Sequence, residues 1–333
     1  MTTIYDIARM AGVSVATVSR HLNGTAAVSP GTGARIQAAI ESTGFALNLA
    51  ASSLTTKRTG LLGFLTSDMI NPFTAEVGQA MTEEAGELGF SLLTAITGGH
   101  EVRFLQMLTE LRRHSVDGVV VTPPQTARTV AALTEFVAGG TPLTTIGVDL
   151  VSAGAAFVSV DTYSGALAAV QHLIDLGHRR IGFLGGPDPD STPGRLRAYT
   201  EALIEASIPV ESALMMGGTL DREGGAEAME QLIQSRQPPT AVFAVNDVMA
   251  LGALQAAHAN RLRVPDDLSI VGFDDIAMAS FASPPLTTVA QPKALLGRTA
   301  ARFVISQLVD QTTPQPLRLS TELVFRSSTA PPG

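Results

Sequence analysis

Along most of the chain, short apolar runs alternate with longer stretches whose apolar residues recur at helical spacing. The apolar runs lie at 61–66, 90–96, 117–122, 143–148, 180–185, 241–245 and 268–273. The helical stretches between them lie at 74–88, 102–114, 164–177, 195–206, 223–236 and 247–260. Strands that are apolar throughout are typical of parallel sheets covered on both faces. The pattern predicts an α/β body of two doubly wound parallel-sheet lobes, with ligand at the carboxyl ends of the strands.

The first sixty residues have a different pattern, that of three short helices at 4–11, 15–23 and 30–43. Thr3, Ser14 and Ser29 are suited to cap their N-termini, and Gly12 and Gly44 to end the first and third. Two short helices joined by a turn that contains glycine are typical of a helix-turn-helix. We therefore expect an all-α head.

The second of these helices has one apolar face and one polar face. At 100° per residue, Val18 and Leu22 lie together and are expected to pack inward. Ala16 and Arg20 lie on roughly the opposite side, and we expect Val15, Ala16 and Arg20 to point outward. This helix is therefore the candidate for contact with a partner.

Composition excludes several classes of site. The 333 residues contain no cysteine, which rules out disulfides, thiolate metal sites and cysteine nucleophiles. The six histidines show no metal-binding spacing, and no phosphate loop, serine elbow or dinucleotide fingerprint is present, so neither metal nor cofactor is expected. The N-terminus lacks a secretory pattern and no apolar stretch reaches 18 residues, so we expect a cytoplasmic protein without a membrane helix.

Charge is unevenly distributed. The whole chain carries a net charge of −8, which by itself argues against nucleic acid as a partner. Residues 1–60, however, hold five basic and two acidic residues, whereas residues 61–333 hold 17 basic and 28 acidic ones. A basic head on an acidic body suggests a nucleic-acid-binding module joined to another function.

The head also carries a specific resemblance. TIYDIARMAGVSVATVSRHLNG at 3–24, VSP at 28–30 and NLAASSL at 48–54 resemble the DNA-binding head of the lactose/galactose repressor (LacI/GalR) family. The resemblance implies that the second helix enters the major groove of double-stranded DNA. It assigns base edges to Val15, Ala16 and Arg20, with Arg20 suited to guanine. It assigns phosphates to Thr3, Ser14, Thr17, Ser19 and Asn23, although helix solubility explains Thr17 and Ser19 equally well.

Residues 48–54 resemble the family's hinge helix, which enters the minor groove. The resemblance places Asn48 at its start and makes Leu54 the wedge that opens a central base step. Two departures stand out: Leu47 replaces the usual proline, and Gly33 lies inside the third helix, where glycine costs about 1 kcal/mol relative to alanine.

The body continues the resemblance to about residue 326. Its motifs are DMINPFTAE at 68–76, HLIDLGHRRIGFLGGP at 172–187, RLRAY at 195–199, AVFAVNDVMALGAL at 241–254 and VPDDLSIVGFDD at 264–275. Such bodies are similar to periplasmic sugar-binding proteins, close around a small effector and form homodimers. The expected domains are a head at 1–46, a hinge and linker at 47–59, a body at 60–326 and a tail at 327–333. Within the body we expect a first lobe at 60–160 plus 292–326 and a second lobe at 161–291.

Effector-binding candidates follow strands in these motifs. They are Asn71, Phe73, Asp149, Arg195, Leu220, Asn246 and Asp274. Carboxylates, an amide and one guanidinium suit the hydroxyls of a polyol. Alternatives remain open. Asn246 is also suited to cap a helix and Phe73 to pack between the lobes, and Asp247 and Asp275 are suited to act as caps or hinge contacts.

Two departures shape the expected effector. Leu220 stands where the family has an aromatic platform, so it offers an apolar wall without a π face. The loop at 188–194 is acidic, which disfavours an anionic ligand. We expect a neutral sugar or nucleoside.

The leading hypothesis is therefore a homodimeric, effector-controlled transcriptional repressor that binds a near-palindromic operator. A solute-binding protein without DNA function is the alternative, and the head argues against it. An enzyme is disfavoured, because the adjacent acids Asp274 and Asp275 have no accompanying nucleophile and base. The last residues, SSTAPPG, show no heptads, so we expect no tetramer-forming helical tail.

Overall fold

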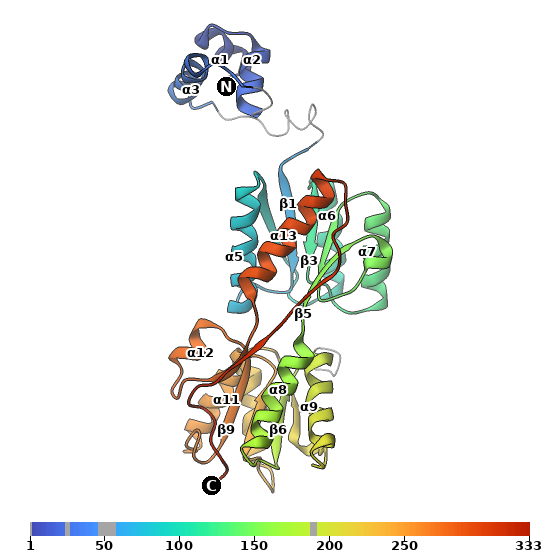
Figure 1. Cartoon of the computed structure of the whole chain (residues 1–333), viewed down its shortest axis with the longest axis vertical. Helices are drawn as coiled ribbons and strands as arrows, with labels where there is room; N and C mark the ends of the chain where they lie inside the picture. Colours follow the sequence, from blue (N-terminus) through green and yellow to red (C-terminus); the bar gives the residue numbers. More distant parts are fainter. Residues whose placement is uncertain (1, 24–26, 46–57, 187–191) are drawn as a thin grey trace. The chain divides into compact units, whose positions relative to one another are not determined.

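The computed structural model of the chain describes residues 2–23, 27–45, 58–186 and 192–333. The chain divides into two compact units, residues 1–59 and 60–333 (Figure 1). Each unit has its own hydrophobic core. The expected hinge residues Asn48 and Leu54 lie outside the described residues.

The head contains the three expected helices, α1 (Ile4–Ala11), α2 (Val15–Asn23) and α3 (Pro30–Thr43). Thr3 and Asp6 form a capping box at the start of α1, and Gly12 ends that helix at φ 62°. Gly44 ends α3 in the same conformation. The core of the head comprises Ile7, Ala8, Ala11, Val18, Ile36 and Ala39. The helix-turn-helix prediction is confirmed.

Gly33 lies where α3 approaches α2. A Cβ at this position would come within 3.3 Å of Cε1 of His21. The close approach gives a physical reason for a residue that helix propensity alone disfavours.

The first lobe of the body is a six-stranded sheet with the order β11-β5-β4-β3-β1-β2. Its strands are β1 (Leu61–Thr66), β2 (Ser91–Ile96), β3 (Gly118–Val121), β4 (Leu143–Ile146), β5 (Ala156–Val160) and β11 (Leu317–Leu319). Its helices are α5 (Pro72–Glu87), α6 (Glu101–Arg113), α7 (Ala127–Ala138), α13 (Lys293–Val309) and the short η1 (Val151–Ala153). All the strand pairs in this sheet are parallel.

The second lobe repeats this plan with the order β12-β10-β9-β8-β6-β7. Its strands are β6 (Ile181–Gly185), β7 (Met215–Gly217), β8 (Ala241–Ala244), β9 (Ser269–Asp274), β10 (Thr287–Ala290) and β12 (Glu322–Val324). Its helices are α8 (Thr162–Asp175), α9 (Pro193–Glu205), α10 (Arg222–Ile233), α11 (Asp247–Ala259), α12 (Ala277–Phe281) and η3 (Ser212–Leu214). The first five strands of each lobe follow the doubly wound order 2-1-3-4-5, which confirms the predicted fold class.

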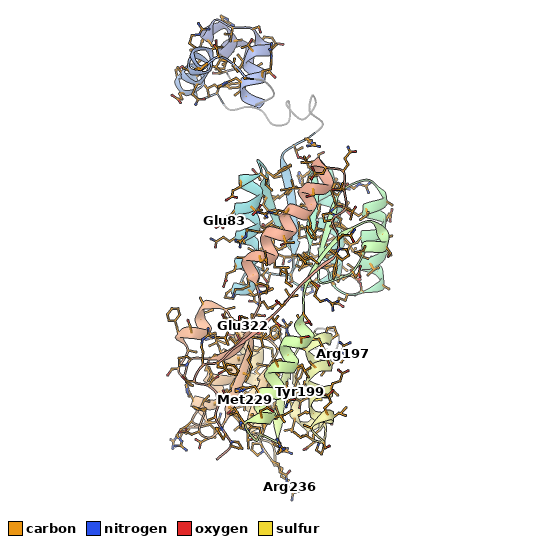
Figure 2. The ribbon with its side chains drawn as sticks, in the orientation of Figure 1. Glu83, Arg197, Tyr199, Met229, Arg236 and Glu322 are labelled. Carbon is orange, nitrogen blue, oxygen red and sulfur yellow. The ribbon has the colours of Figure 1, made fainter. Side chains whose placement is uncertain are left out.

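The chain passes between the lobes three times. It leaves the first sheet after β5, returns before α13, and crosses again between β11 and β12 (Figure 1). The expectation that residues 292–326 stay in the first lobe differs from the structure, because β12 pairs antiparallel with β10 of the second sheet. Glu322, labelled in Figure 2, pairs there with Ala290.

The expected tail, residues 327–333, is also part of the second lobe. Ser328 is fully buried, its hydroxyl donates to the carbonyl of Ile270 at 2.6 Å, and it accepts from the amide of Thr287 at 2.8 Å. His178, also buried, lies 2.9 Å through Nε2 from the carbonyl oxygen of Ala330. Burial lowers the pKa of His178. The last residues therefore close the core of the lobe.

This anchoring yields a stability prediction. Ser328→Ala should lower the free energy of unfolding by about 1–3 kcal/mol, because it leaves a buried carbonyl and a buried amide without their partner. Urea denaturation followed by circular dichroism measures the change. Ser327→Ala, at the exposed neighbour, is the matched control and should stay within about 0.5 kcal/mol of the natural chain. Equal stabilities for the two variants would contradict a structural role for the C-terminal segment.

Candidate functional site

The candidate DNA-binding surface is the outer face of α2. Ala16 and Arg20 are exposed as expected, and Nε of Arg20 lies 3.3 Å from the carbonyl oxygen of Ala16. Val18 is fully buried and Leu22 packs against the core. Val15 differs from the expectation, because it is half-buried and packs partly against the same core. The outward face of α2 therefore consists mainly of Ala16 and Arg20.

The polar residues assigned to phosphates already have local partners in the head. The hydroxyl of Thr3 donates to Asp6, and the hydrogen bonds from Thr3 lower the pKa of Asp6. Ser14 accepts from the amide of Thr17 at 3.2 Å, so it caps α2. Ser19 is half-buried. The side chain of Asn23, like Asn48 and Leu54, lies outside what the structure describes.

The candidate effector site centres on Arg195 and Asp274. Asp274 ends β9 and is almost completely buried, and Arg195 lies in the first turn of α9. Nη2 of Arg195 is 3.5 Å from Oδ1 of Asp274, and its guanidinium lies 4.1 Å from the ring centroid of Phe273. Within the described residues, Nε of Arg195 is buried without a hydrogen-bond partner. This long, incomplete pair leaves polar capacity for a ligand.

The helix that carries Arg195 is held firmly against the sheet. Tyr199, one turn later in α9 and labelled in Figure 2, is fully buried and donates its hydroxyl to the carbonyl of Ile181 at 2.8 Å. Burial raises the pKa of this hydroxyl, so it remains a donor at neutral pH. Tyr199 thereby fixes the start of α9 and with it the guanidinium of Arg195.

Burial raises the pKa of Asp274 to about 6, although the positive charge of Arg195 and a hydrogen bond from Gln291 lower it. Nε2 of Gln291 donates to Oδ1 of Asp274 at 2.6 Å. The backbone of Asp274 has φ 114°, a conformation that side chains other than glycine adopt at a cost. Asp274 is thus held in a strained backbone conformation, and its burial disfavours the charged form of the carboxyl.

Asp247 supports the turn that carries Asp274. Its buried carboxyl accepts from the amide of Ile276 at 2.9 Å and from the hydroxyl of Thr288 at 2.5 Å. Gly272 makes room for it, since a Cβ there would lie 2.2 Å from Oδ1 of Asp247. Burial, with a further contribution from Asp274, raises the pKa of Asp247 to about 8. The sequence allowed a cap or a hinge contact for Asp247. The N-cap of α11 is Asn246, and Ile276 and Thr288 both lie in the second lobe, so the contacts of Asp247 support the turn within that lobe.

Three other candidates form hydrogen bonds within the protein that cap helices or fix loops. Asn246 is buried and caps α11: Oδ1 accepts from Met249, and Nδ2 donates to the carbonyl of Leu220 at 3.1 Å. Asn71 caps α5 through the amide of Phe73. Asp149 is exposed and accepts from the amide of Val151. Asn246, with both ends of its amide engaged, is therefore the candidate least available to a ligand.

The first lobe contributes an uncharged pocket of about 190 Å³ at the carboxyl ends of its strands. It is lined by Phe64, Thr66, Ser67, Phe73, Thr74, Val77, Thr122, Ile146 and Leu296. Phe73 packs against the cores of both lobes, as one of its two expected roles requires, and it also lines this pocket, while its contact with a ligand stays a prediction. Thr66 and Thr122 were not predicted as pocket residues from the sequence, although each is the last residue of a predicted apolar strand.

A larger cavity of about 470 Å³ lies elsewhere, between α5 and α13. It is lined by Glu84, Leu88, Phe90, Arg302, Ile305, Ser306, Val309 and Asp310. None of the predicted site residues lines it. Two of its three charged side chains, Glu84 and Arg302, pair with each other at 2.6 Å, and the third is Asp310.

Two further findings concern metal ions and membrane helices. In the described parts of the chain, no cluster of three or more histidine, aspartate or glutamate side chains is placed to hold a metal ion. Among the same residues, no helix has the length and apolar composition needed to cross a membrane.

Comparison with known proteins adds to this geometry. A model of the bacterial regulatory proteins of the lacI family matches residues 3–48, and a model of a periplasmic binding protein-like domain matches residues 170–329. The HTH-type transcriptional regulator DegA of Bacillus subtilis (strain 168) is 36% identical, over 99% of this chain and 98% of its own. The structure of the lac repressor dimer bound to operator and an anti-inducer is 29% identical, with a TM-score of 0.87 and 99% of each chain covered. The structure of a complex of the transcriptional regulator CelR with cellobiose is 32% identical, with a TM-score of 0.72, and covers 98% of this chain and 100% of that one.

The raised pKa of Asp274 yields a pH prediction. A carboxyl whose pKa rises from 3.8 to about 6 on folding contributes stability that is complete below pH 3.8 and is lost as the pH rises through 6. An asparagine in its place would carry no charge at any pH. The free energy of unfolding of Asp274→Asn relative to the natural chain should therefore increase between about pH 4 and pH 7, by on the order of 2–3 kcal/mol. Urea denaturation across this range measures it, and a difference that stays constant would contradict the burial of a charged Asp274.

Proposed function

Because the chain belongs to the lacI family of bacterial regulatory proteins, we propose that it is a transcriptional repressor whose affinity for an operator changes when a small neutral effector binds between its two lobes. The observation that carries this proposal is the buried, incomplete Arg195–Asp274 pair at the carboxyl ends of strands, in a body joined to a helix-turn-helix head. The head supplies DNA binding and the body supplies its control.

Binding to DNA would use the outer face of α2. Arg20 is exposed and long enough to reach a guanine edge, while the methyl group of Ala16 suits apolar contact with a thymine. Val15 is half-buried, so less of its side chain is available to contact a base. Thr3, Ser14, Thr17, Ser19 and Asn23 would contact phosphates, and Asn48 and Leu54 would form the minor-groove hinge, as the family resemblance implies.

The effector would span two chemically different half-sites. The second lobe offers Arg195 and Asp274, which suit vicinal hydroxyl groups, and the first lobe offers the uncharged pocket around Phe73. Of the seven candidates, Arg195, Asp274 and Phe73 have the strongest support. The side chains of Asp149 and Leu220 are exposed to solvent. Asn71 and Asn246 act mainly as helix caps. A neutral sugar or nucleoside fits this division, since CH groups face apolar side chains while hydroxyls meet the charged pair.

An anionic effector is disfavoured by the charges present. Among the described residues, the two cations nearest Asp274 are Arg195 and Lys293, and each already faces a carboxylate. Asp274 and Glu76 would repel a phosphate group there. CelR, a relative of similar fold, was solved with the neutral disaccharide cellobiose, which agrees with this choice.

A homodimer is part of the proposal. β2 is an edge strand of the first sheet, and it exposes Leu93 and Ile96. Ile70 and Phe281 are also exposed, at 94% and 84%. Exposed apolar side chains on an edge strand are typical of surfaces that a partner covers. Two heads presented by a symmetric dimer match a near-palindromic operator.

The alternatives have less support. A solute-binding protein without DNA function does not account for the helix-turn-helix head. An enzyme has less support because the relatives are named as transcriptional regulators. We propose accordingly that the chain acts in the cytoplasm, where operator DNA is found, without cofactor or catalytic step.

The role of Arg20 predicts a loss of specificity. Arg20→Ala should weaken binding to operator relative to random DNA by about tenfold to hundredfold, the range of one bidentate base contact at about 1–3 kcal/mol. Fluorescence anisotropy with DNA from upstream of the chain's own gene measures both affinities. Arg9→Ala, which removes the same charge from exposed α1, is the control and should leave the ratio unchanged. Equal loss on both DNAs would make Arg20 a phosphate contact, and no specific binding by the natural chain at low salt would refute the proposed function.

The effector site predicts a pattern of ligand stabilisation. In a thermal-shift panel on the full chain, a neutral pentose, hexose, disaccharide or nucleoside at about 100 times its dissociation constant should raise the unfolding midpoint by about 4 °C. The corresponding sugar phosphates should have no effect. Arg195→Met should lose the response. A panel in which only phosphorylated compounds stabilise the chain would contradict the charge argument.

A further inference from the structure

Lys293 lies where the chain returns from the second lobe to the first, and its side chain contacts both lobes. It is the first residue of α13, directly after the second crossover, and its side chain is only 12% exposed. Its ammonium donates to the carbonyl oxygen of Asp274 at 3.1 Å and to that of Asp275, both in the second lobe. The same ammonium lies 3.4 Å from Oε2 of Glu76 on α5, in the first lobe.

These three contacts match what a lysine can provide. An ammonium has three N–H donors arranged as a compact tetrahedron, whereas the guanidinium of arginine is a broad planar fork. The chain contains 20 arginines and only two lysines, Lys57 and Lys293. Because its three donors radiate from one nitrogen, the ammonium of Lys293 can reach two adjacent carbonyls and a carboxylate at once.

The turn that Lys293 holds is the one that presents Asp274. Asp274 and Asp275 both have positive φ, 114° and 51°, so the turn needs support from outside. Asp247 supports it from within the second lobe through the amide of Ile276. Arg326, beyond the third crossover, pairs with Oδ1 of Asp275 at 2.6 Å. The turn is thus bound to two of the segments that follow the crossovers between the lobes.

We propose that Lys293 is a positioning residue that holds Asp274 for the effector and ties its turn to the first lobe through Glu76. A change in the spacing of the lobes would then move Asp274, and a ligand bound to Asp274 would favour one spacing over another. The proposal rests on the proposed function for the effector, but the tie between the lobes exists without DNA or ligand and can be tested alone.

The absence of cysteine makes the test direct. Ala131→Cys on α7 and Gln231→Cys on α10 place one spin label on the exposed surface of each lobe. Double electron–electron resonance then reports the distance distribution between the lobes in the full chain, without DNA or sugar. Hydrogen–deuterium exchange of a peptide covering 272–280 reports on the turn in the same samples.

Three variants are compared in this background. Lys293→Met removes the ammonium, Glu76→Ala removes only its first-lobe partner, and Arg298→Met removes a cation from the exposed face of the same helix as a control. We expect Lys293→Met to shift or broaden the distance distribution and to raise exchange in the turn by about tenfold to hundredfold, as for loss of a hydrogen bond to a charged group. Glu76→Ala should change the distance distribution in the same direction, and Arg298→Met should change neither measurement.

Each other outcome overturns the proposal. Faster exchange in the turn with unchanged distances would make Lys293 a local structural residue of the second lobe. Unchanged distances and unchanged exchange in a folded Lys293→Met would show that it holds neither. If Lys293→Met does not fold, Glu76→Ala decides, and an unchanged distance distribution in that variant refutes the tie. A failed operator assay leaves these readings intact, so the two failures are distinguishable.

Discussion

Arg195 and Asp274 bring opposite charges into the interior of the second lobe without joining them closely. Removing both from water is costly, and at 3.5 Å with one buried guanidinium N–H left unpartnered within the described residues, their attraction is an incomplete compensation. The pKa of Asp274, raised to about 6, expresses the same cost. Such an arrangement is stable only because the rest of the lobe enforces it. The proposed role for the pair is that hydroxyl groups of a ligand would complete these hydrogen bonds.

The fold enforces this arrangement in two ways. The doubly wound order of each sheet brings the ends of β6, β8 and β9 to one edge, where α9 and the turn after β9 deliver the guanidinium and the carboxylate. The second crossover then connects that edge with the first lobe, because Gln291 and Lys293 contact Asp274 and Lys293 also pairs with Glu76 of the first lobe. Arg326, which follows the third crossover, pairs with Asp275 within the second lobe. A ligand at Asp274, as proposed, would therefore act on residues that belong to the connections between the lobes. Control of DNA binding by a small molecule requires such a link.

Local signals made much of the structure predictable from sequence. The helices of the head follow from caps such as Thr3 and Gly12, whose effects reach only a few residues along the chain. The lobes follow from apolar runs, and placement after such runs made Arg195 and Asp274 candidate site residues, which the structure brings within 3.5 Å of each other. Long-range contacts were not predictable. β12 is only three residues long, and its pairing with β10 is a contact between segments far apart in the sequence. Ser328 is likewise buried, with hydrogen bonds to strands some 40 and 60 residues earlier.

The same distinction explains the individual residues. Asn246 was recognised as a possible cap and is one, but its second bond, to Leu220, depends on tertiary structure. Asp247 and Lys293 act on a turn that periodicity does not mark. Val15 packs partly against the core of the head, to which α1 and α3 also contribute and which a helical wheel of α2 alone does not show.

The claim that Arg195 and Asp274 serve ligand binding rather than stability is tested most directly by replacing both. In Arg195→Met/Asp274→Asn, urea denaturation and operator anisotropy with a neutral sugar panel are measured on the same preparation. The account predicts a free energy of unfolding equal to or above that of the natural chain, since uncharged residues avoid the cost of burial. It also predicts operator binding that no sugar alters. A strongly destabilised variant, or one that still responds to sugar, would contradict the account.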